Sequence, residues 1–242
     1  MALFGLIGGD KPTPKNIDKQ VARVKERYSQ PEYRRTAMER LLSWGTPEAI
    51  EGLLARFTVV VQSPHWDEEE KRWLVEELVE KGPVAKEALV RFLSRENHIA
   101  FAAQALRQLT AADEYVALLA KALGARSPDD YRSAQGKQEL VACLAEAGAS
   151  TAGEFLVPYL DDHADDVQCA TIDAVEALRA EPGFERLRRM VTEEAHSARV
   201  LRHAAGAMSR LEIHVDPTSA LAAAVVEDYV VRDGKLARAT DG

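Results

Sequence analysis

Apolar residues recur along this chain at the spacing of amphipathic helices that come in pairs. One leucine near the end of a helical stretch returns at intervals of 37, 31, 35, 34 and 33 residues, namely Leu41, Leu78, Leu109, Leu144, Leu178 and Leu211. A second series keeps step with it and consists of two apolar residues three positions apart: Leu54/Phe57, Leu89/Phe92, Leu119/Ala122, Leu156/Tyr159 and Leu187/Met190. Self-similarity at this period is typical of a solenoid whose repeats bury their apolar faces against their neighbours.

Proline, glycine and small polar residues mark where the first helices begin and end. The pattern predicts one helix from Asn16 to about Ser29 and a second that Pro31 opens and Gly45 closes. The run Thr46-Pro47-Glu48 then supplies an N-cap, a proline for the first turn and an early acid. These signals predict the first complete helical pair.

The same signals return in the second and third pairs, with helices predicted over 66–81, after Pro83, over 99–109 and over 115–123. Between the first two pairs, the β-branched run Val59-Val60-Val61 either extends a helix or forms a short buried connection. A longer loop over 124–130 precedes the next helix.

The helical period weakens after Pro217, and a hairpin signal follows. Asp233-Gly234 lies within the run from Tyr229 to Ala237 and is the two-residue signature of a type I′ β-hairpin. We therefore predict an all-α fold, a right-handed α-solenoid superhelix of five to six helical pairs with a short C-terminal β-hairpin cap. The predicted divisions are an apolar, flexible lead-in over 1–14, the solenoid over 15–215 and the cap over 216–242.

The helix turns carry a further pattern. Asp166, Val167, Ala170, Ala174 and Leu178, and the step from Thr46 through Ile50 to Leu53-Leu54, resemble the bacterial HEAT-repeat family, in particular the short repeats of the phycobilin-lyase type. The resemblance covers about residues 31–212 and implies HEAT-like helical pairs. Such repeats serve as scaffolds, lyases, hydroxylases and glycosylases, so the resemblance implies a fold and leaves the activity open. Gln168 stands where many of these repeats carry an arginine.

Charge narrows the classes of partner. The chain has 31 basic and 39 acidic residues and a net charge of -8, which argues against nucleic acid as a partner because phosphate backbones attract basic proteins. The charge is unevenly distributed, since residues 1–45 hold nine basic and five acidic side chains, whereas residues 96–180 hold six and fourteen.

The two cysteines and the apolar N-terminal segment indicate the cellular compartment of the protein. Cys143 and Cys169 stand apart from any Cys/His grouping, so neither a zinc site nor a disulfide framework is predicted, and a reducing compartment fits. The start from Ala2 to Ile7 lacks a basic n-region and the roughly 20 apolar residues of a membrane span. We expect a cytoplasmic protein without a cofactor.

A cationic surface is the best candidate for a binding site. Four basic residues follow one another at i+4 in the first predicted helical stretch and two more extend the positive end: Lys15, Lys19, Arg23, Arg27, Arg34 and Arg35. With the apolar Ala2 to Ile7, they fit an acidic protein partner better than an anionic membrane surface. The alternative for such a run is a solvated helix face.

Two clusters contain metal-ligand residue types. The first, Asp161, Asp162, His163, Asp165 and Asp166, lies in a turn where acids cap the next helix, and it lacks the glycine and terminal glutamate of an EF-hand. The second consists of Glu193, His196 and His203, which a predicted N-cap at Ser197 places on different elements. No metal site is predicted.

Enzymes are the alternative class. A DNA glycosylase of HEAT architecture would use residue types that Trp66, Asp67, Arg72 and Trp73 supply, but the two tryptophans share one helical face, where packing is the common role. No G-x-S-x-G, Walker or dinucleotide motif is present, so no catalytic residue is assigned. We expect a non-catalytic protein–protein interaction scaffold, with a HEAT-like DNA glycosylase or bilin-lyase-like enzyme as the alternative. A third possibility is that Ala2 to Ile7 inserts into a second copy.

Overall fold

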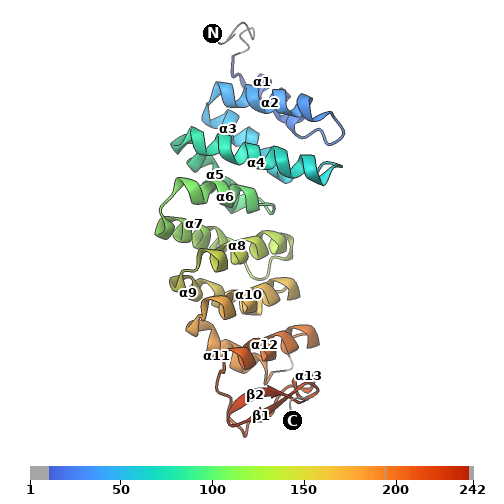
Figure 1. Cartoon of the computed structure of the whole chain (residues 1–242), viewed down its shortest axis with the longest axis vertical. Coiled ribbons are helices and arrows are strands. Elements are labelled where there is room, and N and C mark those ends of the chain that lie inside the picture. Colours follow the sequence, from blue (N-terminus) through green and yellow to red (C-terminus); the bar gives the residue numbers. More distant parts are fainter. Residues whose placement is uncertain (1–10, 194, 240–242) are drawn as a thin grey trace. The chain divides into compact units, whose positions relative to one another are not determined.

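The computed structural model describes residues 11–193 and 195–239, and its contacts divide the chain into two compact units, residues 1–111 and 112–242. The described part is mostly helical with one two-stranded antiparallel hairpin, as predicted (Figure 1). The division falls between two helices. The predicted boundaries at residues 15 and 216 stay predictions, and the apolar segment Ala2 to Ile7 lies outside the described residues.

Unit 1 is built from helices that pack in two rows. Its elements are α1 (Pro14–Val24), α2 (Pro31–Trp44), α3 (Pro47–Leu53), the 3₁₀ turn η1 (Leu54–Thr58), α4 (Pro64–Lys81), α5 (Pro83–Arg95) and α6 (Ala100–Leu109). Helices α1, α3 and α5 contact one another in order, and α2, α4 and α6 do the same. Each helix therefore meets a neighbour in its own row as well as one in the other row.

The helix starts in unit 1 follow from capping chemistry. The side chains of Thr13, Thr46 and Ser63 accept hydrogen bonds from backbone N–H groups in the first turns of α1, α3 and α4. A proline occupies the first turn of α1 to α5, where its missing N–H costs nothing. Gly45 ends α2 with φ of 62°, the left-handed conformation that favours glycine. The predicted cap at Thr46 and end at Gly45 are confirmed.

The predicted end of the first helix is wrong. Helix α1 stops at Val24, and the following segment reaches α2 as an irregular loop over 25–30. The open question at Val59 to Val61 is also settled. Val59 is extended, with φ of -106° and ψ of 135°, so the run forms a short connection in which Val59 and Val61 are buried and Val60 is exposed.

Unit 2 repeats the two rows and adds the hairpin. Its elements are α7 (Ala112–Gly124), η2 (Tyr131–Ser133), α8 (Ala134–Ala147), η3 (Ser150–Ala152), α9 (Gly153–Leu156), η4 (Val157–Asp161), α10 (Asp165–Leu178), α11 (Glu181–Met190), α12 (Ala198–Arg210), α13 (Ala223–Val226), β1 (Tyr229–Arg232) and β2 (Lys235–Arg238). Helices α8, α10 and α12 form one row, and α9 connects α7 with α11 in the other.

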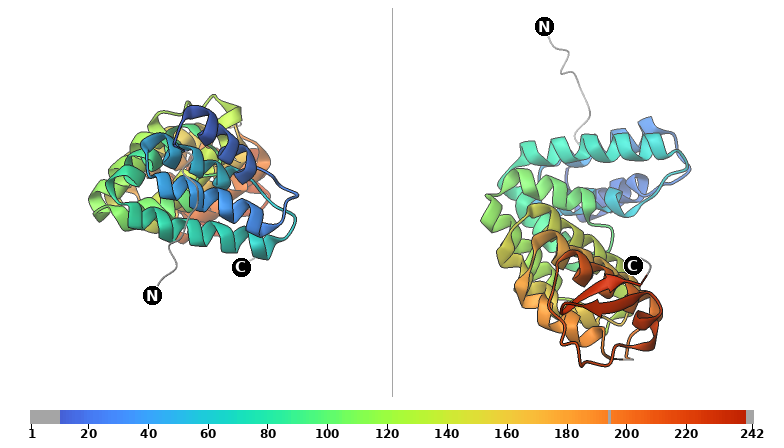
Figure 2. Two further views of the ribbon diagram at one scale, coloured as in Figure 1. Left: turned by 90° about the horizontal axis from the view of Figure 1, so that it is seen from above. Right: turned by 60° about the horizontal axis from the view of Figure 1, so that its bottom comes forward.

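The hairpin packs against α12, as the right-hand view of Figure 2 shows. Its turn is Asp233-Gly234, with φ of 49° and 71°, which fits the predicted type I′ turn. The register pairs Tyr229 with Arg238 and Val231 with Leu236. Because opposite residues of paired strands share a face, Tyr229 and Arg238 lie on the same side of the hairpin.

The two apolar series differ in burial. Every member of the paired series, from Leu54/Phe57 to Leu187/Met190, is buried. In the single-leucine series Leu41, Leu78 and Leu144 are fully buried, whereas Leu109, Leu178 and Leu211 are half-buried. Among the residues that the structure describes, no helix combines the length and apolar character that crossing a membrane would require.

Candidate interaction sites

The structure separates the six predicted contact residues into exposed and engaged side chains. Lys15 and Lys19 are exposed on α1, as predicted. Arg23 is half-buried, because its guanidinium lies over the ring of Tyr33 at 5.3 Å from the centroid. These three side chains therefore share α1, but only the two lysines extend fully into solvent.

Arg27 does not continue the stripe on α1, because that helix ends at Val24. It lies in the loop over 25–30, and its Nε donates to the carbonyl oxygen of Val60 at 2.9 Å. That bond joins the loop before α2 to the connection before α4. Arg27 remains exposed, so it is still available to a partner, from a different element than predicted.

Arg34 is not a surface residue, and its inclusion in the cationic surface is wrong. It is 2% exposed and donates to both carboxylate oxygens of Glu70, at 3.0 and 2.7 Å. Its Nη1 also donates to the carbonyl oxygen of Ser29 at 2.7 Å. A buried guanidinium needs such partners, since unpaired burial is strongly unfavourable. Arg34 therefore fixes the loop before its own helix.

Arg35 points to the other side of α2. Its guanidinium lies 3.2 Å from the ring centroid of Trp73, and its Nε donates to Glu39 at 3.0 Å. Trp73 in turn donates from its indole nitrogen to Glu77 at 2.8 Å. Arg35 thus stacks between α2 and α4, and Trp73 has the packing role that its helical spacing indicates.

A network of charged side chains surrounds the buried Arg56 in unit 1. Arg56 is fully buried and donates to Glu70 and Asp67, each at 2.8 Å, while Lys71 donates to Asp67 at 2.7 Å. Burial opposes the charged form of Asp67, but hydrogen bonds from Lys71 and Arg56 outweigh it and lower the pKa of this carboxyl. Asp67, the acid of the glycosylase alternative, is therefore a structural partner of two cations.

Buried cations recur at one position of the repeat, which the apolar pattern alone did not reveal. Arg34, Lys71 and Lys137 each lie seven residues before a leucine of the first series, and all three are buried. Lys137 lies 2.5 Å from Asp162 and donates to the carbonyl oxygens of Ser127 and Pro128. Aligning the chain on its leucines would have shown this register, because Ala102, Thr171 and Ala204 stand at the same position.

Exposed aromatic side chains gather where the loop over 25–30 meets the start of α4. We call Arg27, Tyr28, Val60 and Trp66 the Tyr28/Trp66 surface. Tyr28 is 76% exposed, Val60 52% and Trp66 46%. Tyr28, Arg27 and Trp66 line a hollow of about 240 Å³ whose inner wall includes the buried Arg34. The surface belongs entirely to unit 1.

The acidic cluster of unit 2 is used by the fold. Asp165 and Asp166 occupy the first turn of α10, where the helix dipole favours acids. Asp162 is buried against Lys137, and Asp161 accepts two hydrogen bonds from Arg186 Nε, at 2.9 and 2.8 Å. Among the described residues, no group of three or more His, Cys, Asp or Glu side chains is arranged to hold a metal ion.

His196 is held by hydrogen bonds on both ring nitrogens. Gln168 donates its amide nitrogen to the carbonyl oxygen of Asp162, so its oxygen accepts from His196 Nδ1 at 3.0 Å. The other nitrogen, Nε2, then accepts from Arg186 at 2.9 Å. Burial, reinforced by the Arg186 charge, lowers the pKa of His196. Glu193 also binds Arg186, at 2.9 Å, so this cluster is centred on a guanidinium.

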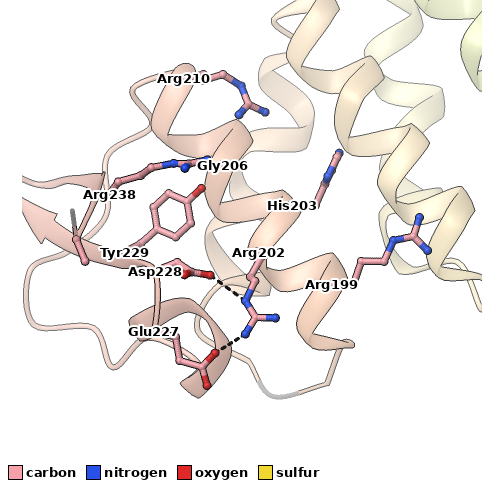
Figure 3. A pocket seen from close by; sticks show the side chains of 10 residues that line it. Arg199, Arg202, His203, Gly206, Arg210, Glu227, Asp228, Tyr229 and Arg238 are labelled. Carbon is pink, nitrogen blue, oxygen red and sulfur yellow. Dashed lines mark hydrogen bonds and ion pairs between the residues drawn. The ribbon is translucent and has the colours of Figure 1, made fainter. Parts of the chain in front are cut away.

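A larger hollow, of about 660 Å³, lies between α12 and the hairpin of unit 2 (Figure 3). We call it the α12 groove. On the α12 side, Arg199, His203 and Arg210 lie on one helical face and pair with acids of α10, at 2.6 Å to Asp166, 2.7 Å to Asp173 and 2.5 Å to Glu176. The bond from Arg210 lowers the pKa of Glu176. These pairs turn the basic side chains toward α10.

The hairpin side of the α12 groove has a different arrangement. Arg202 binds both Glu227 and Asp228, the latter at 2.9 Å. Arg238 and Tyr229 direct their polar ends toward Gly206 (Figure 3). This site was not predicted from the sequence, because its two walls are separated by the turn residues after α12. The basic residues spaced along α12 were the available signal.

Comparisons with protein-family models, with curated proteins and with solved structures found no match to this chain.

Proposed function

We propose that this chain is a non-catalytic protein-binding scaffold, an α-solenoid of HEAT-like helical pairs, whose partner docks on the Tyr28/Trp66 surface. The observation that carries the proposal is the exposure of Tyr28 and Trp66 beside Arg27, around a hollow in unit 1. Tyrosine, tryptophan and arginine are the residues that contribute most binding energy at protein interfaces. Large aromatic side chains exposed together are unusual without a partner.

The solenoid part of the proposal rests on packing within each unit. Helices form two rows in unit 1 and again in unit 2, and buried cations return at one repeat position in both. Stacked repeats of this kind offer extended, rigid surfaces to a partner. A rigid surface loses little conformational entropy when the partner binds.

The chemistry of the partner follows from the exposed cations of unit 1. Lys15, Lys19, Lys25 and Arg27 are exposed, and Arg27 belongs to the Tyr28/Trp66 surface itself. Acidic side chains on the partner would complement them and speed encounter. We therefore propose an acidic protein partner.

Side chains suited to catalysis have structural roles, which favours binding over chemistry. Asp67 is paired with two cations, and His196 is hydrogen-bonded through both ring nitrogens. Burial raises the pKa of the Cys169 thiol, which disfavours the reactive thiolate. The glycosylase and lyase alternatives gain no support from these residues.

Site-specific photo-crosslinking tests the proposal. A photoreactive phenylalanine analogue replaces Tyr28 in one variant and Tyr131, which is 68% exposed in unit 2, in the control. Irradiation in cells of the native host should give one discrete protein adduct from position 28 that position 131 does not give.

Charge-reversal variants test whether the exposed cations of unit 1 contribute to partner binding. Lys15→Glu, Lys19→Glu and Arg27→Glu together should reduce the adduct about tenfold or more, because they replace attraction by repulsion. Lys121→Glu, at an exposed lysine of α7, should leave the adduct unchanged. The same adduct from positions 28 and 131, or none from position 28, would refute the proposal.

A further inference from the structure

Tyr229 is a buried residue whose hydroxyl group remains accessible to solvent. The residue is only 6% exposed, yet its hydroxyl has no hydrogen-bond partner among residues 11–193 and 195–239. The hydroxyl opens onto the α12 groove (Figure 3). Because the hydroxyl is accessible and has no partner in the described part of the chain, it can donate a hydrogen bond to a group that enters the groove.

Gly206 makes room in front of that hydroxyl. A Cβ atom added to Gly206 would lie 3.2 Å from Tyr229 Oη and 3.2 Å from Arg210 Nη1. Arg210 uses Nε and Nη2 for Glu176, which leaves Nη1 as a further donor. The bare backbone of α12 thus leaves the Tyr229 hydroxyl and Arg210 Nη1 close to the same point.

Arg238 adds the charge. It pairs with Tyr229 across the hairpin, so the two side chains share the face toward α12. The four arginines that line the groove differ in whether they form ion pairs. Arg199, Arg202 and Arg210 form ion pairs, whereas Arg238 has no ion-pair partner within the described part of the chain. Arg238 is exposed, and in the view of Figure 3 its guanidinium points toward the same stretch of α12, around Gly206, as the Tyr229 hydroxyl.

The balance of charge selects the ligand class. Arg238 has no ion-pair partner in the described part of the chain, whereas Glu227 and Asp228 share the single cation Arg202 on the hairpin side, so the two arginines and two carboxylates there leave no net positive charge. Two nearby carboxylates would repel a doubly charged phosphate, but a singly charged group matches the single unpaired guanidinium. A planar carboxylate also suits the two parallel N–H donors of an arginine, with the hydroxyl as a third donor.

We propose that the α12 groove binds a carboxylate group, held by the Arg238 guanidinium and the Tyr229 hydroxyl, with Arg210 Nη1 as a third donor. The groove is far larger than a carboxylate, so the remainder of a small organic acid or of a peptide segment fits beside it. This site lies wholly in unit 2 and does not depend on the function proposed for the Tyr28/Trp66 surface.

Nuclear magnetic resonance titration of the full chain tests the proposal. The arginine Nε–H and tyrosine ring signals are followed while acetate, methyl phosphate or the peptide acetyl-Gly-Glu-Gly-amide is added at constant ionic strength. Acetate should shift the Arg238 and Tyr229 signals saturably and more tightly than methyl phosphate. Peptide binding at least about tenfold tighter than acetate would identify a polypeptide as the source, whereas equal affinity would identify a free acid.

Two substitutions and one control complete the test. Arg238→Gln and Tyr229→Phe should each weaken acetate binding, Arg238→Gln by about tenfold or more, because a charge-assisted bond is lost. Arg189→Gln removes an exposed arginine outside the groove and should change nothing. Equal binding by the wild type and Arg238→Gln, tighter binding of methyl phosphate, or shifts that never saturate would overturn the proposal.

Discussion

At the scale of single residues, the protonation of His196 should make the stability of the fold depend on pH. Its pKa is lowered by burial and then by Arg186, and these outweigh the opposing charges of Asp161, Glu193 and Asp165. The unfolded chain therefore takes up this proton near its ordinary pKa of about 6.5, while the folded chain resists it. The histidine contributes stability above that pH, and the contribution is lost as the pH falls from 6.5 toward the folded value.

We expect His196→Asn to remove this pH dependence. The asparagine amide can still donate to Gln168 in place of Nδ1 but does not titrate in this range. Thermal melts at pH 7.5 and 5.5 should show the wild type losing more stability than the variant between the two values. An identical loss in both proteins would mean that His196 does not carry the effect.

The sequence predicted the structural role of some residues but not of others. The caps at Thr46 and Ser197 could be predicted because capping is local, and both side chains accept hydrogen bonds from the following turn. Arg34 could not, because a run of basic residues does not show which of them turns inward. Its partner Glu70 is 36 residues away, and only the fold brings the two together.

At the scale of helices, close approach depends on glycines that the sequence pattern did not single out. Gly52 in α3 faces α1, and a Cβ atom there would lie 2.6 Å from a methyl carbon of Val21 and 3.5 Å from one of Ile17. Helix propensity alone would favour alanine at this position. The contact between α1 and α3 therefore requires glycine for steric reasons.

We expect Gly52→Ala to lower the free energy of unfolding by about 1–3 kcal/mol, the usual cost of overpacking. Gly124 is the matched control, since it ends α7 with no atom within 4 Å of an added Cβ, and its replacement should be neutral or stabilise by up to about 1 kcal/mol. Urea denaturation of both variants measures the difference. A stabilised Gly52→Ala protein would show that the two helices can move apart without loss.

At the scale of the molecule, each unit has its own core and its own buried charges. Arg34, Arg56 and Lys71 belong to unit 1, and Lys137 with Asp162 belongs to unit 2. The HEAT-like interpretation predicts one solenoid over residues 15–215 without a division, because stacked repeats share a continuous core. The place of the division, between α6 and α7, carried no composition signal and follows from three-dimensional contacts alone.

Because each unit has its own core, we expect a destabilising substitution in unit 2 to leave unit 1 folded. Lys137→Met leaves Asp162 buried without its cation, which should cost about 3–5 kcal/mol. In hydrogen–deuterium exchange, amides of α8 and α10 should lose protection while those of α2 and α4 keep theirs, because local opening follows cooperative units. Adding Asp162→Asn removes the uncompensated charge and should restore part of the protection. Equal losses in both units would instead mean that residues 11–239 unfold as one block, and the two cores would then share a single stability.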